Sequence, residues 1–281
     1  MKTILVPTDL SNNALNALKY ALKLAEAGSS RLIVFHCSNQ SPAILMEATT
    51  PSARELMVKD DIKTKKIALS KHVEKALKLT ASDIQPRLIV ESNPFVVENV
   101  LEVAQRSKVS LIVMGTHGAS GMEKVLFGSN TTELISKSEI PVLAIPEKYR
   151  FKEVKKILFA TDLADFPNEL KKVIPFSKAT GAAVNVLYMD YGPHITGDKL
   201  VNAMKFSSRK GYENVKIILK PATIEVPLFN QLSDAIATLK PGWVVMFTKE
   251  RSFWDKIFRK SKTEKLAYEL KYPLLSFRKN G

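Results

Sequence analysis

The sequence predicts an α/β protein made of two tandem doubly wound domains, each a five-stranded parallel sheet with helices on both faces. Short apolar runs such as Leu111 to Met114, typical of strands covered on both faces, alternate with segments whose apolar residues recur at helical spacing. This alternation implies βαβ units with right-handed crossovers. The pattern of the first strand also returns 153 residues later, so that Lys156 to Leu163 matches Thr3 to Leu10. A duplicated parallel-sheet domain accounts for all three observations.

The first half begins with a predicted strand from Thr3 to Pro7, which places Thr8 and Asp9 at its carboxyl end. Ser11 or Asn12 can cap the helix that follows. The other expected elements are, in order, a helix from Ala14 to Ala27, a strand from Arg31 to Cys37, a long basic helix from Ser52 to Thr80, a strand from Pro86 to Glu91, a helix from Val96 to Lys108, and strands from Leu111 to Met114 and Pro141 to Ile145. The long helix is expected to turn these residues towards the core: Leu56, Ile62, Ile67, Leu69, Val73, Ala76 and Leu77.

A glycine-rich stretch from Leu111 to Thr131 joins a buried strand to a helix start. Gly115, Gly118 and Gly121 follow the strand and allow backbone N–H groups to converge on one concavity. Gly128 precedes Ser129, Asn130 and Thr131, which are suitable residues for a helix N-cap. Because a helix N-terminus favours anions, this stretch predicts an anion site at the carboxyl edge of the sheet.

The spacing of these residues is more informative than the glycines themselves. Gly115, two residues, Gly118, nine residues and then Gly128-Ser129 resembles the ATP-binding signature of the universal stress protein family. The stretch lacks the Gly-Lys-Ser/Thr end of a Walker A motif and is not a dinucleotide GxGxxG. The resemblance covers nearly the whole chain, although its specific motif lies within residues 1–146. It implies a Rossmann-like fold of the adenine nucleotide alpha hydrolase-like type and ATP as the ligand.

The resemblance also implies which residues would surround the nucleotide. Pro7, Thr8 and Asp9 would border the adenosine, and Cys37 would line the adenine side. Met114 and Gly115 would flank the ribose. The phosphates would be surrounded by His117, Gly118, Gly128, Ser129, Asn130 and Thr131. The chemistry agrees, because a carboxylate such as Asp9 accepts hydrogen bonds from amino or hydroxyl groups but repels phosphate. We expect no catalytic residue, with His117 donating one hydrogen bond at most, and no protein metal site; Mg²⁺ would arrive with ATP, held by phosphates and water.

The second half repeats the architecture but changes the glycine loop. Val244 to Met246 answers Ile112 to Met114 with an offset of 132 residues, 21 fewer than the first offset, and a short helical stretch around Asp198 to Phe206 stands in place of the long helix. We expect a first domain at 1–147 with an intact motif and a degenerate second domain at 154–281. In this register the second half has lost three glycines of the motif: Gly115 becomes Phe247, Gly118 becomes Glu250 and Gly128 becomes Lys260. Only Ser129 is kept, as Ser261. The second half is therefore expected not to bind ATP.

Composition limits the remaining choices. A hydrophobic content of 45%, no run long enough to span a membrane and no signal peptide at the start lead us to expect a cytoplasmic protein. The single cysteine, Cys37, excludes an intramolecular disulfide. Residues 1–150 hold 19 Lys and Arg against 15 Asp and Glu, a net charge of +4, whereas residues 151–281 hold 23 against 13, a net charge of +10. The basic, aromatic stretch from Lys249 to Lys265 is expected to be a solvated face with a packed stripe, not a membrane or nucleic-acid surface.

Three classes of function remain open at this point. The first is an ATP-binding regulatory protein of the stress response, with an unidentified protein partner and at most slow hydrolysis. The second is an enzyme that transfers adenylyl groups with help from His117 or Lys124. The third is a non-nucleotide adaptor that binds an anionic partner through the basic second half. We also expect the strands at Pro141 to Ile145 and Pro273 to Phe277 to pair within the chain as a pseudo-dimer, and leave open a homodimer of two chains.

Overall fold

The computed structural model describes residues 1–39, 50–116, 128–248 and 271–279. The chain divides into two compact units, Met1–Phe151 and Lys152–Gly281, and each is described by itself. The elements of the first unit are β1 (Thr3–Pro7), α1 (Asn12–Ala27), β2 (Arg31–Ser38), α3 (Pro51–Thr80), β3 (Arg87–Ser92), α4 (Val96–Arg106), β4 (Leu111–Gly115), α5 (Ser129–Lys137) and β5 (Val142–Ile145). Those of the second are β6 (Lys156–Ala160), α6 (Phe166–Thr180), β7 (Ala183–Asp190), α7 (Pro193–Ser207), β8 (Val215–Pro221), α8 (Leu228–Leu239), β9 (Trp243–Thr248) and β10 (Leu274–Arg278).

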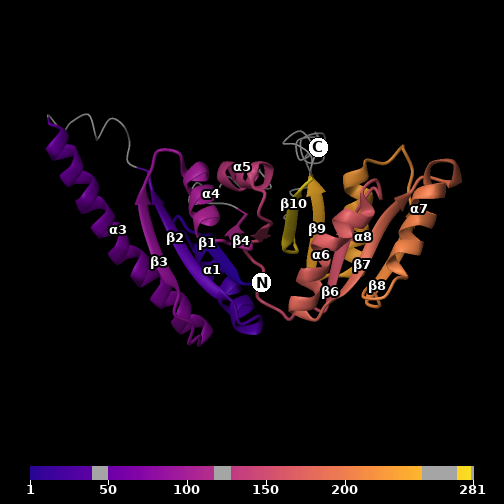
Figure 1. Cartoon of the computed structure of the whole chain (residues 1–281), viewed down its shortest axis with the longest axis horizontal. Coiled ribbons are helices and arrows are strands. Elements are labelled where there is room, and N and C mark those ends of the chain that lie inside the picture. Colours follow the sequence, from indigo (N-terminus) through magenta and orange to yellow (C-terminus); the bar gives the residue numbers. More distant parts are fainter. Residues whose placement is uncertain (40–49, 117–127, 249–270, 280–281) are drawn as a thin grey trace. The chain divides into compact units, whose positions relative to one another are not determined.

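The first unit is a parallel sheet in the order β3-β2-β1-β4-β5. The chain moves outward from β1 to β3 and then crosses back to β4, so right-handed crossovers put α1 and α3 on one face and α4 and α5 on the other. Contacts between α1 and α3, and between α4 and α5, agree with this arrangement, and Figure 1 shows α3 running alongside β3. The predicted fold class is confirmed. The order reverses between β1 and β4, which is where a ligand crevice is expected.

Apolar runs explain the central strands. Ile4, Leu5 and Val6 of β1 are fully buried, and so are Leu111, Ile112 and Val113 of β4. Strands covered on both faces have no solvent side, and their sequences show none of the alternation of half-exposed strands. The first helix is also built as predicted, because Ser11 is its N-cap and its hydroxyl accepts a hydrogen bond from the Ala14 N–H at 3.1 Å.

The long helix α3 departs from the prediction at its outer half. Only Leu69, Val73 and Ala76 are buried on it, whereas Leu56 is 68% exposed and Ile67 is 53% exposed. The helix has 30 residues, but its buried residues all lie in the half nearer its C-terminus. Leu56 and Ile67 are therefore wrong as core residues, because a helix can extend its periodic pattern beyond the surface that covers it.

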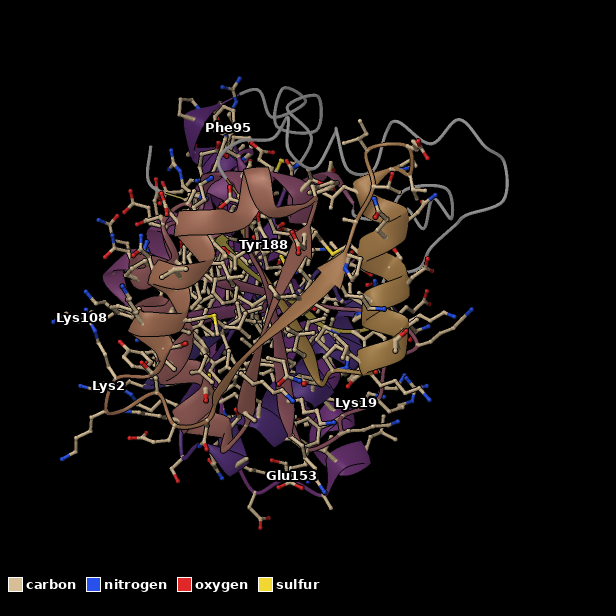
Figure 2. The ribbon with its side chains drawn as sticks, turned by 90° about the vertical axis from the view of Figure 1, so that its right-hand side faces the viewer. Lys2, Lys19, Phe95, Lys108, Glu153 and Tyr188 are labelled. Atoms are coloured by element: carbon tan, nitrogen blue, oxygen red, sulfur yellow. The ribbon has the colours of Figure 1, made fainter. Side chains whose placement is uncertain are left out.

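The second unit repeats the order as β10-β9-β6-β7-β8, again with parallel neighbours. The short helix expected near Asp198 to Phe206 is α7, which begins earlier, at Pro193, and is half the length of α3. Figure 2 shows Tyr188 of β7 inside this unit, with helices on either side, and its side chain is 6% exposed. The pairing of the two last strands stays a prediction.

No helix within the described ranges is both long enough and apolar enough to cross a membrane.

Candidate functional site

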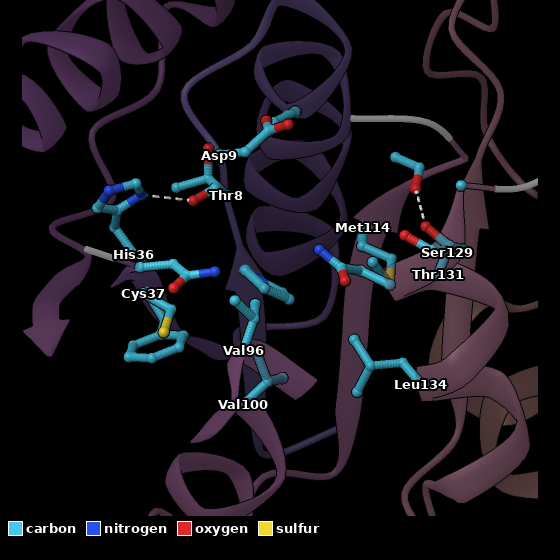
Figure 3. Close-up of a pocket in the computed structure, with 17 residues that line it drawn as sticks. Thr8, Asp9, His36, Cys37, Val96, Val100, Met114, Ser129, Thr131 and Leu134 are labelled. Carbon is cyan, nitrogen blue, oxygen red and sulfur yellow. Dashed lines mark hydrogen bonds between the residues drawn. The ribbon is translucent and has the colours of Figure 1, made fainter. Parts of the chain in front are cut away.

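A cavity of about 390 Å³ lies at the carboxyl edge of the first sheet, where the strand order reverses. Three strands end at it, with Thr8 and Asp9 after β1, Cys37 on β2 and Met114 on β4. Helix α5 begins on the other side. Figure 3 shows Thr8 and Asp9 across the cavity from Ser129 and Thr131. We call this cavity the first cleft.

Thr8 is the most firmly held residue of the first cleft. Its N–H donates to the carbonyl of Phe35 at 2.8 Å, and its hydroxyl accepts from the N–H of Leu10 at 3.0 Å. Leu10 has a φ of +65°, in the left-handed region, so the chain turns sharply after β1. The next carboxylate, Asp9, accepts from the N–H of Ser11 at 3.0 Å and is exposed. The turn thus fixes one negative charge at the rim of the cleft.

Two histidines hold Thr8 from the side of β2 and α3. Nδ1 of His36 donates to the Thr8 carbonyl at 2.8 Å, and Nε2 of His72 lies 3.4 Å from the Thr8 hydroxyl. Because its Nδ1 carries the proton, neutral His36 presents Nε2 as an acceptor, which is buried and has no hydrogen-bond partner among the described residues. Burial lowers the pKa of His72; the charge of Asp9 opposes this effect, and the charge of Lys75 adds to it.

Cys37 lies on the wall formed by β2. Its thiol donates to the carbonyl of Asn93 at 3.3 Å. Burial raises the pKa of this thiol and the charge of Glu91 adds to the effect, while the hydrogen bond to Asn93 opposes both. A thiol that stays protonated behaves as a small apolar group, so Cys37 contributes shape to the cleft and not a nucleophile.

Gly115 leaves little room for a side chain at the end of β4. A Cβ atom at this position would lie 3.0 Å from Cγ and Oδ1 of Asn13, on α1. The carbonyl of Gly115 accepts a hydrogen bond at 3.1 Å from the hydroxyl of Thr131, which is 3% exposed. That bond ties the first turn of α5 to the end of β4. Helix and strand are thereby held on the same side of the first cleft.

Helix α5 begins at least one residue earlier than predicted, because Ser129, Asn130 and Thr131 were the expected N-cap residues and the N-cap is Gly128. Gly128 is the N-cap, with φ −62° and ψ 162°, and no side chain caps the helix. The Gly128 N–H donates to the carbonyl of Thr116 at 2.8 Å, and its carbonyl accepts from the N–H of Thr132 at 3.0 Å. Ser129 and Asn130 are exposed in the first turn. The positive end of the helix dipole therefore opens onto the first cleft without an acidic side chain in its first turn.

Ten of the twelve residues predicted for the site line the first cleft: Pro7, Thr8, Asp9, Cys37, Met114, Gly115, Gly128, Ser129, Asn130 and Thr131. The other two, His117 and Gly118, lie outside the described residues. The sequence analysis missed seven residues of the lining, of which two are polar, His36 and Asn39, and five are apolar: Ala14, Phe35, Val96, Val100 and Leu134. A signal was present, because Val96 and Val100 stand one helical turn apart at the start of α4.

In the second unit, Phe247 stands where Gly115 stands in the first and is 9% exposed. Glu250, Lys260, Ser261 and the basic stretch from Lys249 to Lys265 lie outside the described residues, so the alternative that uses this stretch has no structural observation behind it. Within the described ranges, no group of three or more His, Cys, Asp or Glu side chains is placed to hold a metal ion.

Comparisons with known proteins agree on one family. A model of the universal stress protein family matches residues 1–146. Two universal stress proteins of Methanocaldococcus jannaschii are similar in sequence: one is 29% identical over 144 residues, covering 51% of this chain and 81% of the relative, and the other is 26% identical over 157 residues, covering 52% and 96%. The crystal structure of a universal stress protein from Archaeoglobus fulgidus matches with a TM-score of 0.68 at 17% identity, covering 99% of this chain and 98% of the other. The last comparison shows the fold over both units.

Proposed function

The chain belongs to the universal stress protein family, and from this premise we propose that it is a regulatory protein of the stress response that binds one ATP, in the first cleft. The observation that carries the proposal is the meeting of an uncapped helix N-terminus and an apolar wall in one cavity of about 390 Å³. Adenine nucleotides need both, because their base is planar and apolar while their phosphates carry the charge.

The charges of the first cleft favour one orientation of the nucleotide. The exposed carboxylate of Asp9 would repel phosphates, so the adenosine belongs near β1 and β2, against Cys37 and Val100. The phosphates belong at the start of α5, where the backbone N–H groups and the Ser129 hydroxyl donate. Mg²⁺ would accompany ATP and be held by phosphates and water. His117 and Gly118 keep their proposed place beside the phosphates.

We infer regulation and not rapid turnover. Hydrolysis needs a general base near the attacking water, and the two described histidines contact Thr8, at the end of the first cleft where the adenosine is proposed to lie. Occupancy would instead act on the segment between Thr116 and Gly128, whose two ends are joined by a backbone hydrogen bond of 2.8 Å. A protein partner that reads this surface would sense the nucleotide. We place the protein in the cytoplasm, with the two units as a pseudo-dimer and pairing of chains as an open option.

The test is calorimetric titration of the intact chain with ATP, AMP and GTP, repeated on Gly128→Glu and on its matched control Gly128→Gln. Gly128 has a φ of −62°, which glutamate and glutamine can both adopt without backbone strain. A carboxylate about 5 Å from a phosphate costs ~1–3 kcal/mol at effective dielectric constants of 20 to 80, so Gly128→Glu should weaken ATP binding about tenfold or more. Gly128→Gln should change it far less, because it adds the same bulk without charge.

One ATP per chain with this difference between the two variants supports the proposal. Two ATP per chain would show that the second unit binds ATP as well. Absence of binding at millimolar ATP would refute a nucleotide function. Equal losses in Gly128→Glu and Gly128→Gln would mean that the phosphates do not approach the start of α5.

A further inference from the structure

The second unit has a cavity of its own, of about 320 Å³, at the carboxyl ends of β6, β7 and β9. We call it the second cleft. It lies where the first cleft lies in its own sheet, because Ala160 pairs with Leu187 as Pro7 pairs with Phe35. Continuing that register, Tyr188 stands for His36 and Met189 for Cys37. The two clefts can therefore be compared wall by wall.

The wall that is apolar in the first cleft remains apolar in the second. Tyr188 and Met189 line it from β7, while Leu228 and Leu232 line it from α8, one helical turn apart as Val96 and Val100 are on α4. The part of the second cleft that these residues line, which we call the slot, is apolar. An apolar slot suits a flat aromatic ring, which gains both from burial and from close contact.

The wall that faces phosphates in the first cleft is filled in the second. Phe247 replaces Gly115, and its ring stacks on Phe277 with centroids 4.8 Å apart and an interplanar angle of 10°. The ring of Phe159 also packs against the ring of Phe247, with centroids 5.6 Å apart. A glycine leaves room for backbone and ligand to approach each other, and a buried phenylalanine removes that room. Phosphate groups would meet an aromatic ring here.

The charged residues of the second cleft also disfavour a phosphate. Nζ of Lys279 lies 3.0 Å from Oε1 of Glu169 and 3.1 Å from Oδ1 of Asp162, and its side chain is 11% exposed. Burial alone would lower the pKa of Lys279, but hydrogen bonds to Glu169 and Asp162 raise it, so the lysine remains charged and engaged. Lys199 also lines the cleft, and its positive charge helps to lower the pKa of Asp162. Among the described residues that line the second cleft, two carboxylates and two amines balance, so these residues offer a phosphate no net positive charge.

We propose that the second cleft is a separate binding site for an uncharged, phosphate-free heteroaromatic molecule of nucleoside size. The ring lies in the slot, against apolar side chains such as Met189, Leu228 and Leu232. Asp162, whose carboxylate is 67% exposed, accepts hydrogen bonds from hydroxyl or amino groups of the ligand. The proposal goes beyond ATP binding by the first cleft and rests on residues of the second unit alone. The protein would thus sense two ligands that differ in phosphorylation.

Adenosine and AMP are the matched probes, because they differ by one phosphate. Each is titrated by calorimetry into the intact chain in the presence of saturating ATP, which occupies the first cleft, and again without ATP. The variants are Leu228→Glu, at a residue of the slot that is 42% exposed, and Val201→Glu, a control on α7 that is 48% exposed and outside the lining. Both add one carboxylate to a partly exposed helix position, so both should fold. Fluorescence of the buried Trp243 checks this in the second unit.

We expect one adenosine per chain in the presence of ATP, at least tenfold weaker binding of AMP, a loss of tenfold or more in Leu228→Glu and a change below twofold in Val201→Glu. No adenosine binding at millimolar concentration would overturn the proposal, as would AMP binding equal to adenosine binding, or equal effects of the two variants. If ATP fails to bind, the ATP-free titrations of the Leu228→Glu and Val201→Glu pair still decide, so the two proposals fail separately.

Discussion

Replacing Lys279 by methionine should destabilise the second unit by about 3 kcal/mol. Lys279 neutralises Glu169, which is only 3% exposed, and the two charged atoms are 3.0 Å apart. Removing one partner of a buried ion pair typically costs 3–5 kcal/mol, because the other charge stays buried without compensation. We take the lower end, since the Thr161 hydroxyl would still donate to Glu169 Oε2 at 2.7 Å. Asp162 adds little, because its carboxylate is largely exposed.

Urea unfolding followed by tryptophan fluorescence measures this loss. Both tryptophans of the chain, Trp243 and Trp254, belong to the second unit, so the signal reports that unit. Adding Glu169→Gln to Lys279→Met should recover about 2 kcal/mol, because it removes the uncompensated charge. The control is Lys155→Met, whose pair with Glu153 is 79% and 77% exposed and spans 3.9 Å, and which should cost below about 0.5 kcal/mol. A cost below about 1 kcal/mol for Lys279→Met, without rescue by Glu169→Gln, would refute the reasoning.

Three further predictions concern the first unit. Leu69→Ala on α3, at a fully buried site, should lower the free energy of unfolding by about 2–5 kcal/mol, while Ile67→Ala, at a site 53% exposed, should cost below about 1; urea unfolding compares them, and equal costs would mean that α3 packs differently. Burial of His72 holds its pKa below the ordinary 6.5, so stability that is present above that pH is lost as the pH falls through the lowered pKa, and a His72→Gln variant should show a flatter pH profile; an unchanged profile contradicts this. The raised pKa of Cys37 should make its alkylation by iodoacetamide at pH 8 slower than that of a free thiol, and ATP should slow it further; a rate equal to that of free cysteine would show that the thiol is not shielded.

The sequence located the first cleft well because its residues follow strands. Asp9, Cys37 and Met114 come at or near the carboxyl ends of apolar runs, and parallel strands bring those ends to one edge of the sheet. The pattern of each strand in the sequence therefore predicts that residues far apart along the chain lie together in the cleft. The helix N-cap was missed by one residue because Gly128 and Ser129 are both acceptable there, and only the backbone bond from Gly128 to Thr116 distinguishes them.

The second cleft shows where local patterns are insufficient. Glu169 occupies an ordinary helix position in the sequence, and nothing near it along the chain indicates a partner. Lys279 reaches it across 110 residues of separation, from beyond the last strand. The sequence identified Phe247 as a loss of phosphate chemistry, but not as part of a stacked pair with Phe277. Side-chain contacts between distant segments depend on the three-dimensional register, which periodicity does not encode.

The helix start at Gly128 also has an evolutionary consequence. A glycine N-cap supplies no side-chain acceptor, and serine or aspartate there would satisfy an N–H group of the first turn. Such a replacement usually changes helix stability by a few tenths of a kcal/mol relative to glycine. An anion that needs the same N–H groups would then compete with the protein's own side chain. With phosphates bound at the start of α5 as proposed, selection for thermal stability and selection for ligand affinity would act in opposite directions on this one residue, and a stabilised variant would lose affinity.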